Sequence, residues 1–125
     1  MGKEMNNEYK IQLENDRGEI IVADEVIAVI TGLAAMEVEG VASMAGNATR
    51  ELISMIGIKS LSKGVKVDVL EDVVTVDATL NLKYGYNVKD VSVKVQEKVK
   101  VAIENMTGLT VADVNVRVAG IEVAS

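Results

Sequence analysis

The stretch that decides the fold is residues 65–83, VKVDVLEDVVTVDATLNLK. Apolar and polar residues alternate along it on both sides of Glu71-Asp72. This alternation is typical of strands with one buried face and one wet face, and two such strands joined by a two-residue turn predict a β-hairpin. The residues expected on its buried face are Val65, Val67, Val69, Val74, Val76, Ala78, Leu80 and Leu82.

Downstream of the hairpin, the periodicity changes from that of a strand to that of a helix. Apolar residues recur at helical spacing from about residue 87 to 106, which predicts a long helix. Gly108 follows in the position of a left-handed cap residue, and residues 109–118 predict a last strand. The positions expected to face the core are Val88, Val91, Val95, Val99, Ala102, Ile103 and Met106 of the helix, and Val114, Val116 and Val118 of the strand.

Upstream of the hairpin, residues 9–13 and 19–22 predict two short strands, and Asp24 is placed to cap a helix that runs to about residue 36. A helix that is apolar all round is normally buried on both sides. This helix has a stripe of large apolar residues and, on the opposite side, a row of small residues. Either another element of the chain or another subunit should therefore cover the small-residue side. The expected core stripe is Val26, Val29, Ile30 and Leu33, and the small-residue side is Ala28, Gly32 and Ala35.

Between these parts, residues 38–44 predict a strand interrupted by Gly40, and residues 47–56 predict a short amphipathic helix. The loop-rich residues 46–64 are expected to be the most mobile. The order of elements indicates an α+β fold, with helices packed on one face of a mainly antiparallel or mixed sheet. Residues 1–8 are expected to be a flexible N-terminus, and residues 9–125 a single domain.

The composition narrows the chemistry open to the chain. Its 125 residues include no histidine and no cysteine, so the side chain that titrates near neutral pH, the soft metal ligand and the strongest nucleophile are missing. Neither a metal nor a cofactor is therefore expected. The net charge of −6 argues against nucleic-acid binding, which needs a positive surface. No apolar run reaches the roughly 18 residues of a membrane span, so no direct membrane insertion is expected.

Carboxylates are the main remaining candidates for catalysis, and Asp68 and Asp77 lie on the wet face of the predicted hairpin. Lys66, Asn115 and Arg117 are expected on the same face, where cross-strand pairing explains these charges without a catalytic role. The glycines are dispersed and form no phosphate-cradling motif. An enzyme that uses carboxylates or lysine is therefore the least favoured function.

Three groups of residues are candidate contacts for a partner. Two valines lie opposite the core stripe of the long helix, among charged residues, where they can seed a contact with a partner or a second copy. Two tyrosines precede that helix; they either anchor its start or act as a binding hot spot. On the polar sheet face, the side-chain amide of Asn115 and the guanidinium of Arg117 are the third group of candidate contacts. The candidate interaction surface is therefore Val93, Val101, Tyr84, Tyr86, Asn115 and Arg117.

Four segments resemble, in their order, the alkaline-shock and general-stress protein family of Gram-positive bacteria, also called the envelope stress response family. They are GEIIVADEVIAVITGLAAMEVEGVASM at residues 18–44, GVKVDV at 64–69, LKYGYNV at 82–88 and VQEKVKVAIENMTGLTVADVNVRVAGI at 95–121. The short chain looks like the compact housekeeping branch of that family. The family has no established catalytic residues to carry over to this sequence.

The resemblance implies a small, non-enzymatic cytoplasmic protein that regulates or scaffolds cell-envelope homeostasis through protein–protein contacts. The implied partners are a membrane-anchor protein, which would hold the chain at the inner face of the membrane, or acetyl-CoA carboxylase subunits, which would link it to fatty-acid synthesis. Self-association is expected from the small-residue side of the first helix and the outer valines of the long one. The alternative is a sensor that binds a small lipid-precursor molecule on the sheet face.

Overall fold

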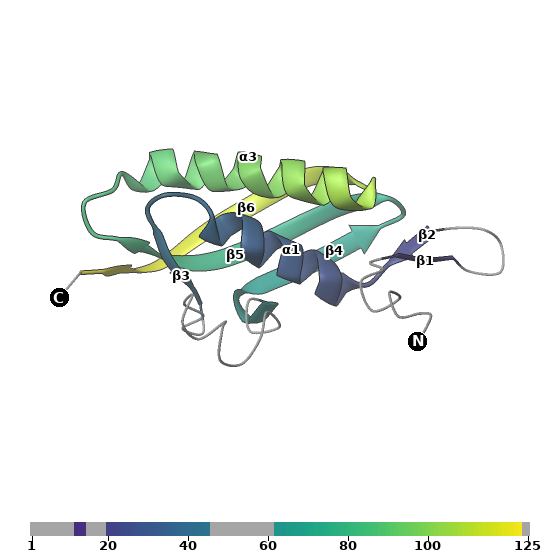
Figure 1. The fold of residues 1–125 in the computed structure, drawn as a ribbon, viewed down its shortest axis with the longest axis horizontal. Helices are drawn as coiled ribbons and strands as arrows, with labels where there is room; N and C mark the ends of the chain where they lie inside the picture. The colour runs from purple at the N-terminus through teal and green to yellow at the C-terminus, as the bar shows by residue number, and fades with distance from the viewer. Residues whose placement is uncertain (1–11, 15–19, 46–61, 124–125) are drawn as a thin grey trace.

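The computed structural model describes residues 12–14, 20–45 and 62–123. Strands β1 and β2 pair with each other, antiparallel, and the other four strands form one sheet. The predicted flexible start at residues 1–8 and the predicted helix at residues 47–56 lie outside the described residues. In chain order the elements are β1 (Gln12–Glu14), β2 (Ile20–Val22), α1 (Asp24–Met36), β3 (Val41–Met44), β4 (Val65–Leu70), β5 (Val73–Lys83), α3 (Val88–Thr107) and β6 (Thr110–Glu122) (Figure 1).

Strand β5 is the centre of the sheet. Along one edge it pairs in parallel with β6, from Val73 opposite Thr110 to Lys83 opposite Glu122. Its other edge is shared, because the first half pairs antiparallel with β4 and the second half pairs antiparallel with β3. The sheet is therefore mixed, which confirms the predicted α+β class.

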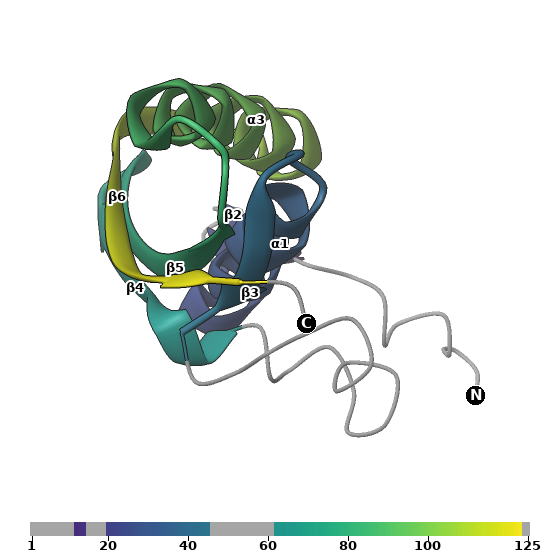
Figure 2. The same cartoon turned by 90° about the vertical axis from the view of Figure 1, so that its left-hand side faces the viewer.

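Helices α1 and α3 cover the same face of this sheet (Figure 2). Helix α3 returns the chain from β5 to β6 and packs against β6 and α1, while α1 packs against β3, β4 and β5. The core between the two layers is built from valine, leucine, isoleucine, methionine and alanine, and Leu80, Val95 and Ile103 are completely buried in it. The opposite face of the sheet carries the polar residues of β5, as the alternation predicts.

The local signals for the hairpin and the long helix are confirmed. Glu71 adopts a positive φ of 58° in the turn between β4 and β5. Asn87 caps α3, since its side chain accepts a hydrogen bond of 3.0 Å from the backbone N–H of Asp90. Gly108 ends the helix in the left-handed conformation, with a φ of 78°. Val88 and Met106, which were expected in the core, are exposed near the two ends of the helix.

Helix α1 has the predicted bounds, and both its expected core stripe and its small-residue side are largely buried. Of the core stripe, Ile30 is buried and Val26 packs against the core. Leu33, expected in the core, is 40% exposed, whereas Ala28 and Ala35 of the small-residue side are buried. Small side chains allow a helix to approach its neighbours closely, so this side meets the rest of the chain. The alternative of a second subunit covering it is wrong. Ala23 rather than Asp24 is the N-cap residue, and Asp24 lies in the first turn, where its charge favours the helix dipole.

Two strand predictions are corrected as well. Strand β3 begins after Gly40 instead of running through it, because Gly40 has a φ of 102° and redirects the chain between α1 and the strand. Strand β6 continues beyond residue 118 to Glu122, because it follows β5 to its end. Two register shifts leave Ala112 and Ala119 of β6 without a partner residue in β5, which is the pattern of a β-bulge.

Candidate functional site

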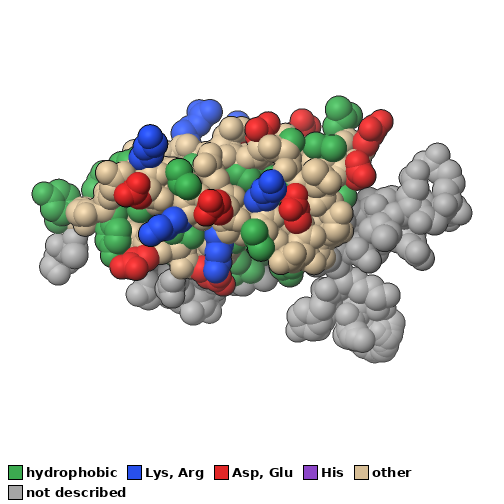
Figure 3. Space-filling view, turned by 90° about the horizontal axis from the view of Figure 1, so that it is seen from above, with side chains coloured by type: hydrophobic (Ala, Val, Ile, Leu, Met, Phe, Trp, Pro, Cys, Tyr) green, Lys and Arg blue, Asp and Glu red, His purple; other side chains and the backbone are tan. Residues whose placement is uncertain are grey.

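The outer face of α3 carries the two valines singled out in the sequence. Val93 is 43% exposed and Val101 is 55% exposed. Figure 3, which looks onto α3, shows apolar side chains separated from one another by positive and negative ones. Lys98 of α3 lies 3.3 Å from Glu37 at the end of α1 and links the two helices. The valines therefore lie where predicted, but charged residues separate them.

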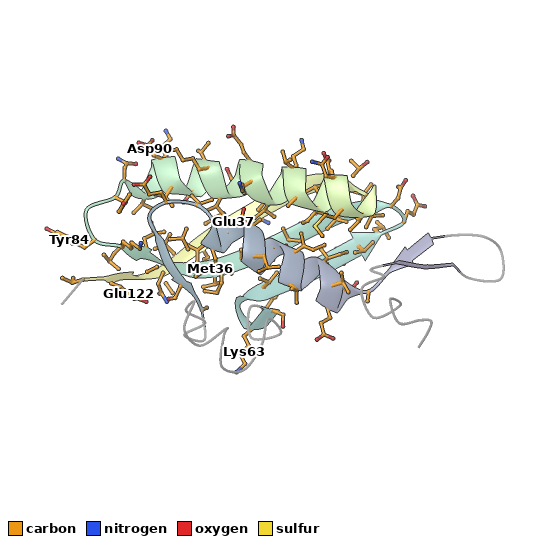
Figure 4. All side chains as sticks on the ribbon, viewed as in Figure 1. Met36, Glu37, Lys63, Tyr84, Asp90 and Glu122 are labelled. Atoms are coloured by element: carbon orange, nitrogen blue, oxygen red, sulfur yellow. The ribbon has the colours of Figure 1, made fainter. Side chains whose placement is uncertain are left out.

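A second exposed set gathers at the end of β5 and β6. The backbone N–H of Tyr84 donates to the carbonyl of Glu122 over 2.8 Å, which keeps the two segments side by side beyond β5. Tyr84 and Val123 are each 72% exposed, and Ile121 is also exposed. Figure 4 shows Tyr84 and Glu122 at the same end of the molecule. We call Tyr84, Ile121 and Val123 the Tyr84 patch.

The sequence prediction missed two members of this patch. The last strand was expected to end at residue 118, so Ile121 and Val123 were not placed beside Tyr84. A signal was present, because the apolar positions move from even numbers at Val116 and Val118 to odd numbers at Ile121 and Val123. The shift marks the bulge at Ala119.

A chain of two hydrogen bonds through the buried Ser43 links the strands next to the patch. The side-chain amide of Asn81 in β5 donates to the hydroxyl of Ser43 in β3 over 3.0 Å. That hydroxyl donates to the carboxylate of Glu122 in β6 over 2.8 Å. Ser43 is completely buried, so the two bonds satisfy a polar group that burial would otherwise penalise. The ends of three strands are thereby held together.

Tyr86 anchors the turn before α3. Its hydroxyl donates to the carboxylate of Glu39 over 3.1 Å, and its ring lies close against the backbone of Gly40. The hydrogen bond and then the negative charge of Glu39 raise the pKa of the Tyr86 phenol above its ordinary value of 10.0. Of the two explanations left open for the tyrosines, anchoring therefore fits Tyr86, whereas Tyr84 is the more exposed of the two.

The sheet face opposite the helices holds the remaining predicted residues. Asp77 lies between Lys66 on β4 and Asn115 on β6, and Arg117 lies opposite Thr79. The side-chain amide of Asn115 donates to Asp77 over 2.7 Å, so cross-strand pairing accounts for this carboxylate. Asn115 and Arg117 thus point away from the helix layer. The six predicted surface residues belong to separate surfaces.

A pocket of about 240 Å³ opens on this polar face. Sequence reasoning placed Lys66, Asp77 and Arg117 together on the face, but it missed Lys63, which reaches the pocket from the turn before β4. Figure 4 shows Lys63 on the side of the molecule away from α3. The lining residues are Ala45, Lys63, Gly64, Lys66, Asp77, Thr79 and Arg117.

Within residues 12–14, 20–45 and 62–123, no group of three or more histidine, cysteine, aspartate and glutamate residues is placed to hold a metal ion. Neither described helix combines the length and the apolar character needed to cross a bilayer.

Known proteins similar to this chain include relatives from bacteria. The chain is 38% identical over 105 residues to the protein YqhY of Bacillus subtilis, which covers 84% of this chain and 78% of that protein. It is 32% identical over 117 residues to YloU of the same organism, which covers 92% of this chain and 98% of that protein. A homologue of the stress response regulator Gls24 from Streptococcus pyogenes is 31% identical over 107 residues, 85% of this chain and 60% of that protein.

No solved structure matches the chain. A family model does match: that of the alkaline shock protein 23 family, described by a cell envelope-related function, aligns with residues 12–123. The aligned residues include every described helix and strand. This match confirms the resemblance carried by the four sequence segments, and the chain belongs to the alkaline shock protein 23 family.

Proposed function

We propose that this chain is a non-enzymatic regulatory or scaffold protein of the cell-envelope stress response that acts through protein–protein contacts. The observation that carries the proposal is the family match over residues 12–123, with its cell envelope-related description. The Streptococcus pyogenes relative named a stress response regulator supports a regulatory role. That name describes a longer protein, 60% of which aligns with this chain.

The Tyr84 patch is the contact surface that we assign to this role. Tyrosine is enriched at binding hot spots because it offers a large apolar ring and a hydroxyl at a low entropic cost. Tyr84 and Val123 are the most exposed large apolar residues beside the buried Ser43 hydrogen-bond chain, which holds the ends of three strands in place. A rigid, exposed apolar patch loses little conformational entropy when a partner covers it. The valines of α3 are the second choice, because charged residues separate them.

The partners to test first are a membrane-anchor protein and acetyl-CoA carboxylase subunits. A membrane anchor would place this chain at the inner face of the membrane, and the carboxylase would link it to fatty-acid synthesis. No catalytic role is assigned to Asp77, because Asn115 holds its carboxylate and Lys66 lies opposite it in the sheet.

Co-purification of the tagged chain from its native cell, followed by rebinding of each purified partner, tests the proposal. The informative pair is Tyr84→Ser with Val123→Ser in one variant and Val93→Ser with Val101→Ser in the other. We expect the first variant to lose the partner and the second to retain it. Retention by the Tyr84-patch variant would reject the patch. Turnover of a metabolite by the purified chain, abolished by one carboxylate substitution while partner binding is kept, would reject the non-enzymatic role.

A further inference from the structure

The pocket on the polar sheet face is rich in positive charge although the chain as a whole is acidic. Its lining includes Lys63, Lys66 and Arg117 and one carboxylate, that of Asp77, which leaves an excess of two positive charges. The complete chain carries a net charge of −6. We name Lys63, Lys66, Arg117 and Asp77 the basic pocket. The lining of the pocket therefore carries a charge of the opposite sign to that of the whole chain.

The three cations of the basic pocket have no anionic partner in the described part of the chain. No ion pair within 4.0 Å joins Lys63, Lys66 or Arg117 to another described residue. Lys66 stands opposite Asp77 in the strand register, but the carboxylate of Asp77 is bonded to Asn115 instead. The donors of all three cations therefore remain available to an external anion.

The walls of the pocket are built from paired backbone, so the Cα atoms that carry these side chains are held at a fixed spacing. The backbone N–H of Ala45 donates to the carbonyl of Thr79 over 2.9 Å. A Cβ atom added at Gly64 would lie 2.7 Å from that same carbonyl, which shows how closely the turn before β4 packs on β5. Thr79 and Arg117 are direct neighbours across β5 and β6. A site whose backbone is already positioned loses less entropy when it binds a ligand.

We propose that the basic pocket binds the phosphate monoester group of a small soluble molecule. A phosphate monoester carries about −1.5 to −2 charges at neutral pH, which matches the excess of two positive charges. The planar fork of Arg117 suits two oxygens of such a group, and the lysines act as point charges. The hydroxyl of Thr79 adds a neutral donor, and the second carboxylate oxygen of Asp77 can accept a hydroxyl of the ligand.

The same phosphate group also occurs at membrane surfaces, on anionic lipids. We assign the soluble form because the net charge of −6 repels an extended anionic surface, whereas a small ion experiences the local field of the pocket. The exposed large apolar residues that would enter a bilayer, such as Tyr84 and Leu70, do not line the pocket.

This inference goes beyond the proposed scaffold role, because the basic pocket and the Tyr84 patch share no residue. A titration of the full chain with inorganic phosphate, monitored by amide NMR shifts, tests the inference. Sodium chloride at matched ionic strength is the control. We expect saturable shifts at Gly64, Thr79 and Arg117 that chloride does not produce. Equal shifts with chloride, or none with phosphate, would overturn the proposal whatever the result of the partner experiment.

Variants separate the pocket from general surface charge. Arg117→Gln and Lys66→Gln should each weaken phosphate binding about tenfold, because each removes a charge-assisted hydrogen bond. Lys94→Gln, which removes an exposed lysine from the distant α3, is the matched control and should leave the affinity unchanged. An equal loss in the control variant would contradict the site. Sedimentation with phosphatidic acid vesicles should leave the protein in the supernatant. Protein that sediments with the vesicles, and no longer does so when Arg117 is substituted, would overturn the assignment to a soluble ligand.

Discussion

At the scale of single residues, two glycines with similar backbone conformations differ in the space available for a side chain. Gly40 and Gly85 both have a positive φ, 102° and 98°, so a side chain at either position strains the backbone. A Cβ atom at Gly40 would lie 2.9 Å from Tyr86 and 2.9 Å from Val91, whereas nothing lies within 4 Å of a Cβ atom at Gly85. The pair therefore separates steric overlap from backbone strain.

We expect Gly40→Ala to lower the free energy of unfolding by about 1–3 kcal/mol more than Gly85→Ala does, because only the first forces neighbouring side chains apart. Chemical denaturation of the two variants measures this difference. Equal losses would mean that Tyr86 and Val91 move aside without cost.

The ionisation of Tyr86 gives a prediction of pH dependence. Because Glu39 raises the pKa of Tyr86 in the folded state, the pair contributes stability that is present below about pH 10 and is lost as the pH rises through the raised pKa. Glu39→Gln keeps a hydrogen-bond acceptor but removes the negative charge, so it should shift the pKa of Tyr86 back toward 10.0. An NMR titration of the Tyr86 ring measures this, and an unchanged pKa would contradict the assigned cause.

At the scale of elements, helix α3 protects the outer edge of β6. The carboxylate of Glu104 accepts a hydrogen bond of 3.0 Å from the backbone N–H of Val111, and the amide of Gln96 donates to the carbonyl of Val114 over 3.0 Å. Both partners belong to β6, whose only described neighbour in the sheet is β5. Side chains of the helix thus form hydrogen bonds with backbone groups that an edge strand would otherwise offer to another chain.

Glu104→Ala should speed hydrogen exchange at the Val111 amide about tenfold, because it removes a hydrogen bond to a charged acceptor. Glu104→Gln keeps an acceptor oxygen and should have a much smaller effect. Glu97→Ala, on the exposed part of the same helix, is the control for changes in helix stability. Equal acceleration in the Glu97 and Glu104 variants would show that fraying of the helix, rather than loss of the bond, controls the exchange.

At the scale of the whole molecule, the two layers meet through β5. Leu80 is completely buried between the sheet and the helices, and its neighbour Thr79 faces the other side. Leu80→Ala should therefore lower the free energy of unfolding by about 2–5 kcal/mol, while Thr79→Ala should cost little. Urea denaturation compares the two variants. Comparable losses would contradict the register of β5.

Self-association remains a prediction with one of its two original reasons removed. The small-residue side of α1 is buried within the chain, so the exposed Val93 and Val101 are the remaining reason. Light scattering should then show a particle larger than one 13.3 kDa chain, and Val93→Glu with Val101→Glu should reduce its size. Lys100→Glu changes the charge of the same helix without removing a valine and serves as the control. A strictly monomeric protein at high concentration would reject the prediction.

The sequence by itself determined the elements whose periodicity is unambiguous. The alternation over residues 65–83 defined the hairpin and its buried face, and the helical spacing of Val91, Val95 and Val99, with Gly108 behind it, defined α3. Such patterns are local, because they follow from which side chains of one element share a face. They also placed Lys66, Asp77, Asn115 and Arg117 on one side of the sheet without any knowledge of strand order.

Only the tertiary structure decided that Leu33 is an exposed apolar residue of α1, because an apolar helix offers no polar face to mark the outside. It also decided that β6 runs parallel to β5 as far as Glu122, and that β3 and β4 share the other edge of β5. Those pairings brought Val123 beside Tyr84 and Lys63 beside Arg117. The physical reason is that periodicity reports neighbours within one element, whereas both candidate sites are made by residues that are distant in the sequence and meet only when the layers pack.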